Sequence, residues 1–315
     1  MRDSYFPQNV RKSPYISYDN LTMNTPPTSV VKIPQVVYCI ICNNCDQTSV
    51  GEPSLSLAEQ IREDPSDAVV LHLNNQNKTL ASLQPESVIG TSSLRRIAQL
   101  RRRYPHLLFQ NIRGNLNTRL RKLDENNTYS ALILANAGLQ RMGWKNRISA
   151  TLPPEDCMHA VGQGALAVEI RANDRDILDI LAPLTDKDTV LQCIAERSFL
   201  KKLEGGCSVP VGVYSSFKKG KLFLQGGVFS LDGAKAVIHC LETDICIQEK
   251  ENEPSDSQEK EELKEFCGVV VSHLNQQLLN KAFKLGLDLA NYLLEKGAKE
   301  ILDEARKANE ASDTL

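Results

Sequence analysis

The chain has 315 residues, of which 41% are hydrophobic and 24% charged, and its formal net charge is −2. This composition is ordinary for a soluble globular protein with about two domains, and it excludes collagen-like, coiled-coil and wholly disordered chains. No apolar run approaches the ~20 residues of a membrane helix, and the first residues lack the apolar core of a secretory signal. Nine cysteines, an odd count, do not indicate a disulfide framework, so we expect a reduced, cytoplasmic compartment.

Residues 1–61 differ in composition from the rest of the chain. They are rich in Pro, Ser, Thr and Asn and show no sustained period of 2 or 3.6 residues. We therefore expect this segment to be atypical and poorly ordered. The exception is Val36–Cys42, a short apolar run that favours a strand.

Three cysteines of this segment, Cys39, Cys42 and Cys45, follow a spacing that is typical of metal or cluster sites. A bacterial ferredoxin-type cluster needs a fourth cysteine at the position that Ser49 occupies here. Zinc needs further ligands, and no pairing is evident. We expect no metal site.

From Arg62 to about residue 161, short apolar runs alternate with amphipathic stretches. This alternation predicts a parallel α/β sheet. The expected strands are Ala68–Leu73, Ser87–Gly90, Leu107–Ile112 and Ala131–Ala135, and the expected helices are Ser93–Arg103 and Asn115–Asp124, followed by a turn or short helix at Gly138–Met142.

After residue 186 the pattern changes to one long helix, a β-meander and two closing helices. The turns Lys-Lys-Gly and Leu-Asp-Gly favour antiparallel pairing of the strands between them. This half of the chain therefore predicts a separate α+β domain. Its expected elements are a helix at Asp188–Leu203, strands at Val209–Ser215, Leu222–Phe229 and Ala236–Cys240, an acidic loop at 248–265, and helices near 278–295 and 298–309 on either side of Gly297.

A block of arginines lies in the first of these regions. Between Thr91 and Arg121 there are eight arginines, no lysine and no acidic residue. The planar guanidinium suits carboxylates bidentately, and lysine does not. Because parallel strands share one carboxyl edge, and Ser and Thr at a helix start leave anion-binding N–H groups there, we expect an arginine-lined crevice for anions. Its predicted members are Ser92, Ser93, Arg95, Arg96, Arg113, Arg119 and Arg141; Arg101, Arg102, Arg103 and Arg121 are expected on solvated helix faces.

Two alternatives stay open at this point. The basic block could bind nucleic acid, although Tyr104 and Phe109 are the only aromatic residues within it and form no stacking motif. Cys207 follows two glycines on a loop between a helix and a strand. It is either an accessible nucleophile or a small buried hydrophobe.

Five ordered sequence blocks together resemble one family. They are TSSLRR at 91–96, IRGNLNTRLRKLD at 112–124, ALILANAGLQRMGW at 131–144, AVGQGAL at 160–166 and ERSFLKKLEGGCSVPVG at 196–212. The chain from about Arg62 to its C-terminus resembles hydroxymethylbilane synthase, also called porphobilinogen deaminase.

The resemblance implies a fold of three domains. The first two form a periplasmic-binding-protein-like pair with the active site between them, and the third is α+β. On this basis residues 62–161 are the second, α/β domain that binds substrate and cofactor. Residues 162–185 are the inter-domain remnant of a largely missing first domain, and residues 186–315 are the C-terminal domain.

The resemblance also implies the chemistry. Four porphobilinogen molecules condense head to tail with loss of ammonia, and water releases linear hydroxymethylbilane. The primer is a dipyrromethane cofactor on a thioether to Cys207. The family is typically monomeric, and its partners are porphobilinogen and polypyrrole intermediates, not nucleic acid or membranes. The implied cofactor-binding residues are Ser92, Ser93, Arg95, Arg96, Arg119, Ala135 and Gly164, and the implied substrate-binding residues are Arg113, Asn115 and Arg141.

The chain departs from the family pattern in its first part. The Ser-Leu-Lys-Asp-x-Pro motif, whose carboxylate stabilises the developing cation, is absent from the sequence, and Arg11-Lys12-Ser13 is only a weak echo of another family motif. No catalytic residue is assigned. Residues 162–185 are expected to lack most of their partner sheet. We therefore expect little activity from this chain, or binding of pyrroles and porphyrins alone.

Overall fold

The computed structural model describes residues 55–171, 174–204, 209–245, 265–271 and 274–313. All of them belong to a compact unit that spans Val37–Leu315, whereas a second unit, Met1–Val36, lies outside the described residues. The expected strand at Val36–Cys42 therefore lies outside the described residues as well.

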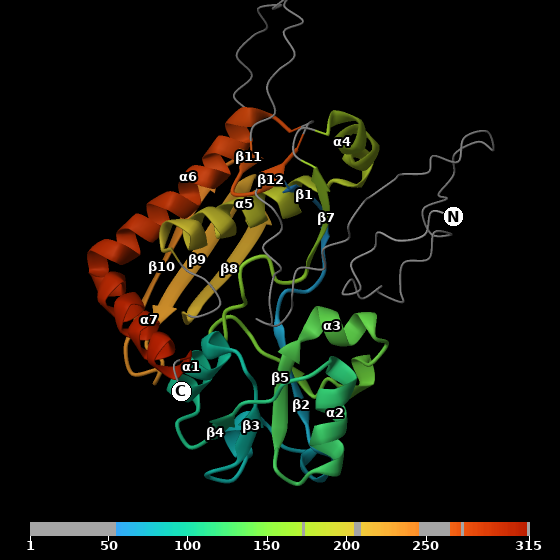
Figure 1. Cartoon of the computed structure of the whole chain (residues 1–315), viewed down its shortest axis with the longest axis vertical. Coiled ribbons are helices and arrows are strands. Elements are labelled where there is room, and N and C mark those ends of the chain that lie inside the picture. The colour runs from blue at the N-terminus through green and yellow to red at the C-terminus, as the bar shows by residue number, and fades with distance from the viewer. Residues whose placement is uncertain (1–54, 172–173, 205–208, 246–264, 272–273, 314–315) are drawn as a thin grey trace, which may run out of the picture. The chain divides into compact units, whose positions relative to one another are not determined.

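A five-stranded sheet forms the core of the first region (Figure 1). Helix α1 covers one face through Leu100, and α2 and α3 cover the other through Leu123 and Leu139. In β5, odd-numbered residues face α1 and even-numbered residues face α2, which explains why the whole strand is apolar. The elements are β2 (Asp67–Leu71), β3 (Val88–Gly90), α1 (Leu94–Arg103), β4 (Leu108–Gln110), α2 (Leu116–Glu125), β5 (Ala131–Ala135), α3 (Asn136–Arg141) and β6 (Ala150–Thr151).

This sheet is mixed, so the expectation of a parallel sheet is confirmed only in part. Its order is β4-β3-β5-β2-β6. Strand β3 is parallel to β4 and β5, whereas β2 is antiparallel to β5 and β6. Parallel neighbours need a crossover, which α1 and α2 provide. Only two 3-10 turns, Leu73–Asn75 and Leu80–Ser82, follow β2.

Strand β1 (Leu55–Arg62) belongs to a second, four-stranded sheet. It pairs antiparallel with β7 (Ala165–Arg171) along the whole of β7, and the sheet order is β11-β12-β1-β7. The boundary expected at residue 62 is therefore wrong, because regular structure already begins at Leu55. The expectation that residues 162–185 lack most of their partner sheet is also wrong for β7. The other two strands, β11 (Glu265–Phe266) and β12 (Val269–Val270), form a short hairpin.

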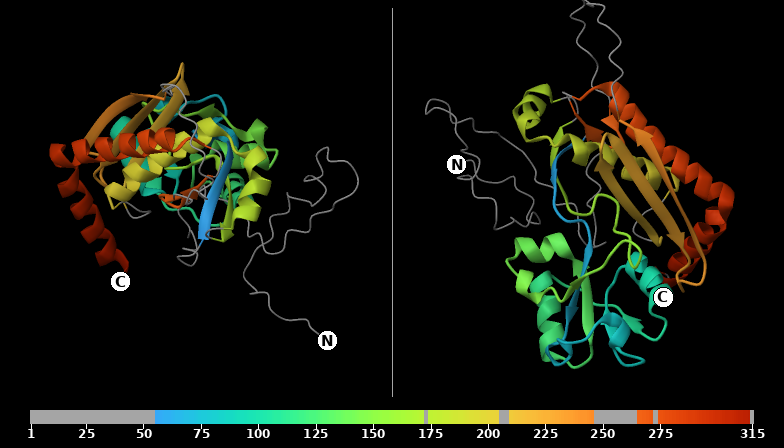
Figure 2. Two further views of the ribbon diagram at one scale, coloured as in Figure 1. Left: turned by 90° about the horizontal axis from the view of Figure 1, so that it is seen from above. Right: turned by 180° about the vertical axis from the view of Figure 1, so that it is seen from behind.

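The C-terminal region confirms the expected α+β pattern. An antiparallel meander of β8 (Val211–Lys218), β9 (Lys221–Phe229) and β10 (Ala236–Asp244) packs against α5 (Lys187–Lys202) and α6 (Gln276–Leu293). Gly297, with φ at +94°, separates α6 from α7 (Lys299–Asp313). In Figure 2, α7 runs at an angle to α6. Phe199, Leu224 and Leu289 are fully buried in the shared core. The short helix α4 (Arg175–Leu181) precedes α5.

Candidate anion-binding edge and its supports

The carboxyl ends of β3, β4 and β5 lie at one edge of the five-stranded sheet, as the arginine argument requires. Because β2 runs antiparallel, its first residue, Asp67, lies at this same edge, opposite Ala135. Asp67 is fully buried and Ala135 is 2% exposed. The acidic residue that sequence reasoning missed is therefore the one closest to the predicted arginines.

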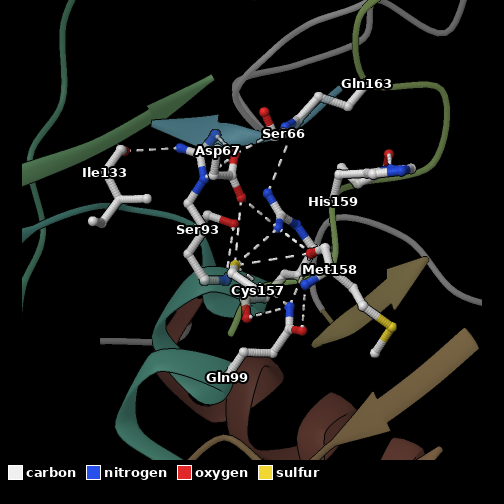
Figure 3. A network of polar contacts seen from close by, with 12 residues as sticks. Ser66, Asp67, Ser93, Gln99, Ile133, Cys157, Met158, His159 and Gln163 are labelled. Carbon is white, nitrogen blue, oxygen red and sulfur yellow. Dashed lines mark hydrogen bonds and ion pairs between the residues drawn. The ribbon is translucent and has the colours of Figure 1, made fainter. Parts of the chain in front are cut away.

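Asp67 binds two arginines of α1 at once (Figure 3). Arg95 Nη1 lies 2.7 Å from Asp67 Oδ2, and Arg96 Nη2 and Nε lie 2.8 and 3.0 Å from Oδ1. Arg96 also donates to the carbonyl of Ile133, and Arg95 donates to the carbonyl of Met158. Both arginines are buried, at 6% and 1% exposure. We expected these two side chains to line an open crevice. They are instead buried inside the domain.

The two arginines keep Asp67 ionised. Burial disfavours the charged form of Asp67, yet the two guanidinium groups outweigh it and hold the pKa of this carboxyl well below its usual range. Asp67 thereby fixes both arginines of the first turn of α1. The positive end of the helix dipole lies at the same turn.

Cys157 lies in the same cluster, 3.4 Å from Asp67 Oδ2. Burial, together with the neighbouring carboxylate, raises the pKa of its thiol to about 12. Cys157 is therefore a neutral thiol and not a nucleophile.

The remaining predicted residues of α1 and α2 differ in exposure. Ser93 caps α1 by accepting from the backbone N–H of Arg96, and Ser92 donates to the carbonyl of Ile112. Arg119 is 3% exposed and donates from Nε to the carbonyl of Gly114 at 2.6 Å. Arg113 and Asn115, which follow β4, are exposed. Of the predicted arginines at this edge, Arg113 presents its side chain to solvent most openly.

Arg141 pairs with an acidic residue of the segment that joins β1 to β2. Its Nε lies 2.8 Å from Glu63 Oε2, and the two side chains are 27% and 33% exposed. The backbone N–H of Glu63 donates to the carbonyl of Gly164. Gly164 has a φ of +81°, and a Cβ at this position would lie 2.4 Å from the Glu63 carbonyl oxygen. Gly164, predicted as a cofactor contact, is thus needed for the close passage of two chain segments.

A second buried ion pair ties these two segments to the C-terminal region. Arg62 Nη1 lies 2.7 Å from Glu196 Oε1, and Glu196 is fully buried on α5. Glu196 also accepts from the backbone N–H of Gly162 and the hydroxyl of Ser215. Burial disfavours its charge, but Arg62 more than compensates and lowers the pKa of Glu196. Sequence reasoning missed this carboxylate.

The C-terminal end of α1 contacts the turn between β9 and β10. Arg101 donates to the carbonyl of Leu231, and Arg102 donates to that of Ala234. Gly233, with a φ of +77°, lies so close to α1 that a Cβ would be 2.4 Å from the Ala98 carbonyl oxygen. Arg101 and Arg102 are exposed, as expected for solvated helix faces, yet their guanidinium groups join α1 to the C-terminal meander.

Arg103 and Arg121 also lie on exposed helix faces. Each pairs with one acidic side chain: Arg103 with Asp156 at 2.7 Å, and Arg121 with Glu125 at 3.8 Å. Both arginines are more than half exposed, and such pairs contribute little to stability.

Several predictions concern residues outside the described part of the chain. Cys207, Cys39, Cys42, Cys45 and the segment Arg11–Ser13 all lie there, so their roles stay predictions. Within the described ranges, no group of three or more His, Cys, Asp or Glu side chains is placed to hold a metal ion. None of the described helices is long and apolar enough to cross a membrane.

Comparison with known proteins identifies the family of these residues. A family model described as "Porphobilinogen deaminase, dipyromethane cofactor binding domain" matches residues 48–179, and one for the C-terminal domain of porphobilinogen deaminase matches residues 190–265. The porphobilinogen deaminase of Prochlorococcus marinus (strain NATL1A) is 45% identical over 250 residues, which cover 79% of this chain and 68% of the relative.

Two further relatives with the same name agree. That of Synechococcus elongatus is 45% identical over 243 residues, covering 77% of this chain and 65% of the relative. That of Nostoc sp. is 52% identical over 176 residues, covering 56% and 54%. The matched region begins at residue 48, before the Arg62 from which the resemblance was first traced.

The described residues fit a ligand that carries several carboxylates. The edge combines the exposed guanidinium of Arg113 with the start of α1, which Arg95, Arg96 and Asp67 hold in place. Forked guanidinium donors and helix N–H groups both match carboxylate oxygens. A dipyrromethane with acidic side chains is such a ligand.

Proposed function

The chain belongs to the porphobilinogen deaminase family, and on this premise we propose that it is a hydroxymethylbilane synthase-type transferase of tetrapyrrole biosynthesis. It condenses porphobilinogen, with loss of ammonia, into linear hydroxymethylbilane. The observation that carries this proposal is the gathering of arginines at one sheet edge inside the segment that matches the family's cofactor-binding domain.

The cofactor of this reaction is dipyrromethane. When bound, it supplies the primer to which pyrrole units are added. We propose Cys207 as its covalent attachment site, and the start of α1 with Ser92 and Ser93 as the place that receives its acidic side chains. Arg95 and Arg96 hold the start of α1 in place through Asp67, and Arg119 and Gly164 hold the local backbone.

Substrate recognition is assigned to the exposed groups. The guanidinium of Arg113 binds one carboxylate of porphobilinogen or of the growing chain, with Asn115 beside it at the start of α2. Arg141 is free to exchange its partly exposed partner Glu63 for a substrate carboxylate, because a surface ion pair costs little to break. We assign no described carboxylate to the stabilisation of the developing cation.

Intact-mass spectrometry of the purified chain tests the cofactor assignment. We expect an added mass equal to one dipyrromethane, which disappears in Cys207→Ala. An unmodified wild-type chain contradicts the assignment. An adduct without turnover of porphobilinogen leaves the second candidate, a protein that binds pyrroles without completing the reaction.

A matched pair of arginines on α2 and its approach tests substrate recognition. We expect Arg113→Ala to raise KM for porphobilinogen about tenfold or more, because a charge-assisted hydrogen bond is lost. Arg121→Ala, which removes another exposed guanidinium, one paired with Glu125, should leave KM unchanged. Equal effects of the two variants would show that only the total charge matters.

A further inference from the structure

The two guanidinium groups assigned to substrate differ in their contacts within the chain. Arg113 is exposed and forms no ion pair with any described residue. Arg141 already holds a carboxylate, because its Nε lies 2.8 Å from Glu63 Oε2. A ligand with two carboxylates therefore meets one open guanidinium and one that an internal anion occupies.

The backbone at Glu63 is fixed. The preceding residue, Arg62, pairs at 2.7 Å with Glu196, which is fully buried. The backbone N–H of Glu63 donates to the carbonyl of Gly164 at 2.9 Å, and a Cβ on Gly164 would lie 2.4 Å from the Glu63 carbonyl oxygen. The carboxylate of Glu63 can therefore leave Arg141 only by rotation of its own side chain.

The helix that carries Arg141 is fixed to the same segment. Asn136, the first residue of α3, donates its backbone N–H to the carbonyl of Ser66 at 3.0 Å and its side-chain amide to the carboxylate of Asp64. Both charged groups of the pair are thus attached to well-held backbone. A partner that is tethered in this way competes with a free ligand at an effective concentration in the millimolar range or above.

The exposure of the pair decides how strongly it holds. The side chains of Arg141 and Glu63 are 27% and 33% exposed, so the pair is a surface ion pair. The equilibrium constant for closing such a pair is about 1.5 to 5. A ligand carboxylate that needs Arg141 open therefore binds about two- to sixfold more weakly than it would without Glu63.

We propose that Glu63 is an internal competitor for the carboxylate site at Arg141, and that it thereby lowers the affinity of the arginine edge for acidic pyrroles. A carboxylate that binds Arg113 displaces nothing, whereas one that binds Arg141 must displace Glu63. This inference rests on the proposed function, since it needs Arg141 to bind a carboxylate of the ligand.

The suitable probe is a pyrrole that carries the two acidic side chains of porphobilinogen but no aminomethyl group, because it cannot lose ammonia and offers no cation to Glu63. We expect Glu63→Gln to bind this probe about two- to sixfold more tightly than the unmutated chain, measured by calorimetry on the full chain. Asp124→Asn is the matched control. Its pair with Arg147 has a distance of 2.7 Å and similar exposure, 29% and 24%, so the affinity should stay unchanged. An equal gain in both variants would assign the effect to total charge and overturn the proposal.

Variants of Arg141 separate this inference from the proposed function. Arg141→Ala should weaken binding of the probe, and Glu63→Gln should have no further effect in that background. If Arg141→Ala leaves the affinity unchanged, the assignment of Arg141 to substrate fails and the inference fails with it. If Arg141→Ala weakens binding but Glu63→Gln does not tighten it, the inference alone fails.

A measurement on the unmutated chain is independent of the stability of any variant. With ¹⁵N-labelled arginine, the Nε resonance of Arg141 should move as the probe replaces Glu63, whereas that of Arg147 should stay in place. An Arg141 resonance that is unmoved at saturation would overturn the proposal.

Discussion

Two buried carboxylates, Asp67 and Glu196, hold the two regions of this molecule in different ways. Each is fully buried. Asp67 accepts from two guanidinium groups, whereas Glu196 accepts from one guanidinium group, one backbone N–H and one hydroxyl. The comparison teaches that Asp67 fixes a helix to its own sheet through two charged partners, while Glu196 connects distant segments through one charged and two neutral partners.

Removal of the Asp67 charge should have the largest effect. Asp67→Asn takes a buried carboxylate away from two buried guanidinium groups, and we expect a loss of about 3–5 kcal/mol in the free energy of unfolding, measured by urea denaturation. Asp124→Asn is the control. Its pair with Arg147 is partly exposed, so the loss should stay near or below about 1 kcal/mol. Similar losses in both variants would contradict the special status of Asp67.

The next largest effect is expected from pH, because His159 titrates in a different pH range from Asp67 and Glu196. Burial, the largest cause, lowers the pKa of His159 beside Glu196 to about 4. The unfolded chain binds this proton already below pH ~6.5. Between these two values the unfolded state holds more protons, so the free energy of unfolding falls by about 3 kcal/mol as pH falls.

Asp67 and Glu196 differ from His159, because each is a carboxyl group whose pKa is lowered in the folded state. Their contributions are present above the ordinary pKa of a carboxyl group and are lost only at more acidic pH. Denaturation between pH 7.5 and 4 should therefore show the His159 slope, and His159→Phe should remove it. A variant with an unchanged slope would assign this proton to another group.

Substitution of Glu196 should cost less stability than substitution of Asp67. Glu196→Gln keeps an acceptor for Gly162 and Ser215 but leaves Arg62 without its anion. Since Arg62 is still 7% exposed, we expect a loss of about 2 kcal/mol in urea denaturation. The double variant with Arg62→Met should recover part of it, because no unpaired charge remains. A loss as large as that of Asp67→Asn would make the two clusters equivalent.

The smallest effect concerns the contact between α1 and the β9–β10 turn. Gly233→Ala and Gly143→Ala place an alanine at similar φ values, +77° and +73°, but nothing lies within 4 Å of a Cβ at Gly143. The extra loss in Gly233→Ala, about 1 kcal/mol, therefore measures the close packing against Ala98. Equal melting temperatures of the two variants would show that the β9–β10 turn moves away from α1 without loss of stability.

Local sequence patterns were sufficient for elements whose residues contact their own neighbours. Strand β5 was expected with its observed ends, and the meander followed from its turns. Asp67 had a local signal that went unused: a carboxylate at the start of a buried strand needs a cationic partner. Glu196 pairs with Arg62 across 134 residues, and the partner of β7 is likewise distant. Such pairings depend on topology, which no local pattern contains.

The roles of the predicted site residues depend on the same distinction. Arginine spacing located the sheet edge, but it did not distinguish Arg113, which is exposed, from Arg96, which is buried. That difference follows from the reversed direction of β2, which brings Asp67 to this edge. Glu63 gave no signal, because its partner Arg141 lies 78 residues away in the sequence.

The close passage at Gly164 limits how the two sheets can move. The chain crosses between them twice, near Glu63 and near Gly164, and the two crossings touch through backbone atoms. Any rotation of one sheet against the other must therefore bend both crossings at the same place. Both crossings therefore bend at one point, and a methyl group added at Gly164 would clash with the Glu63 backbone and block this bending.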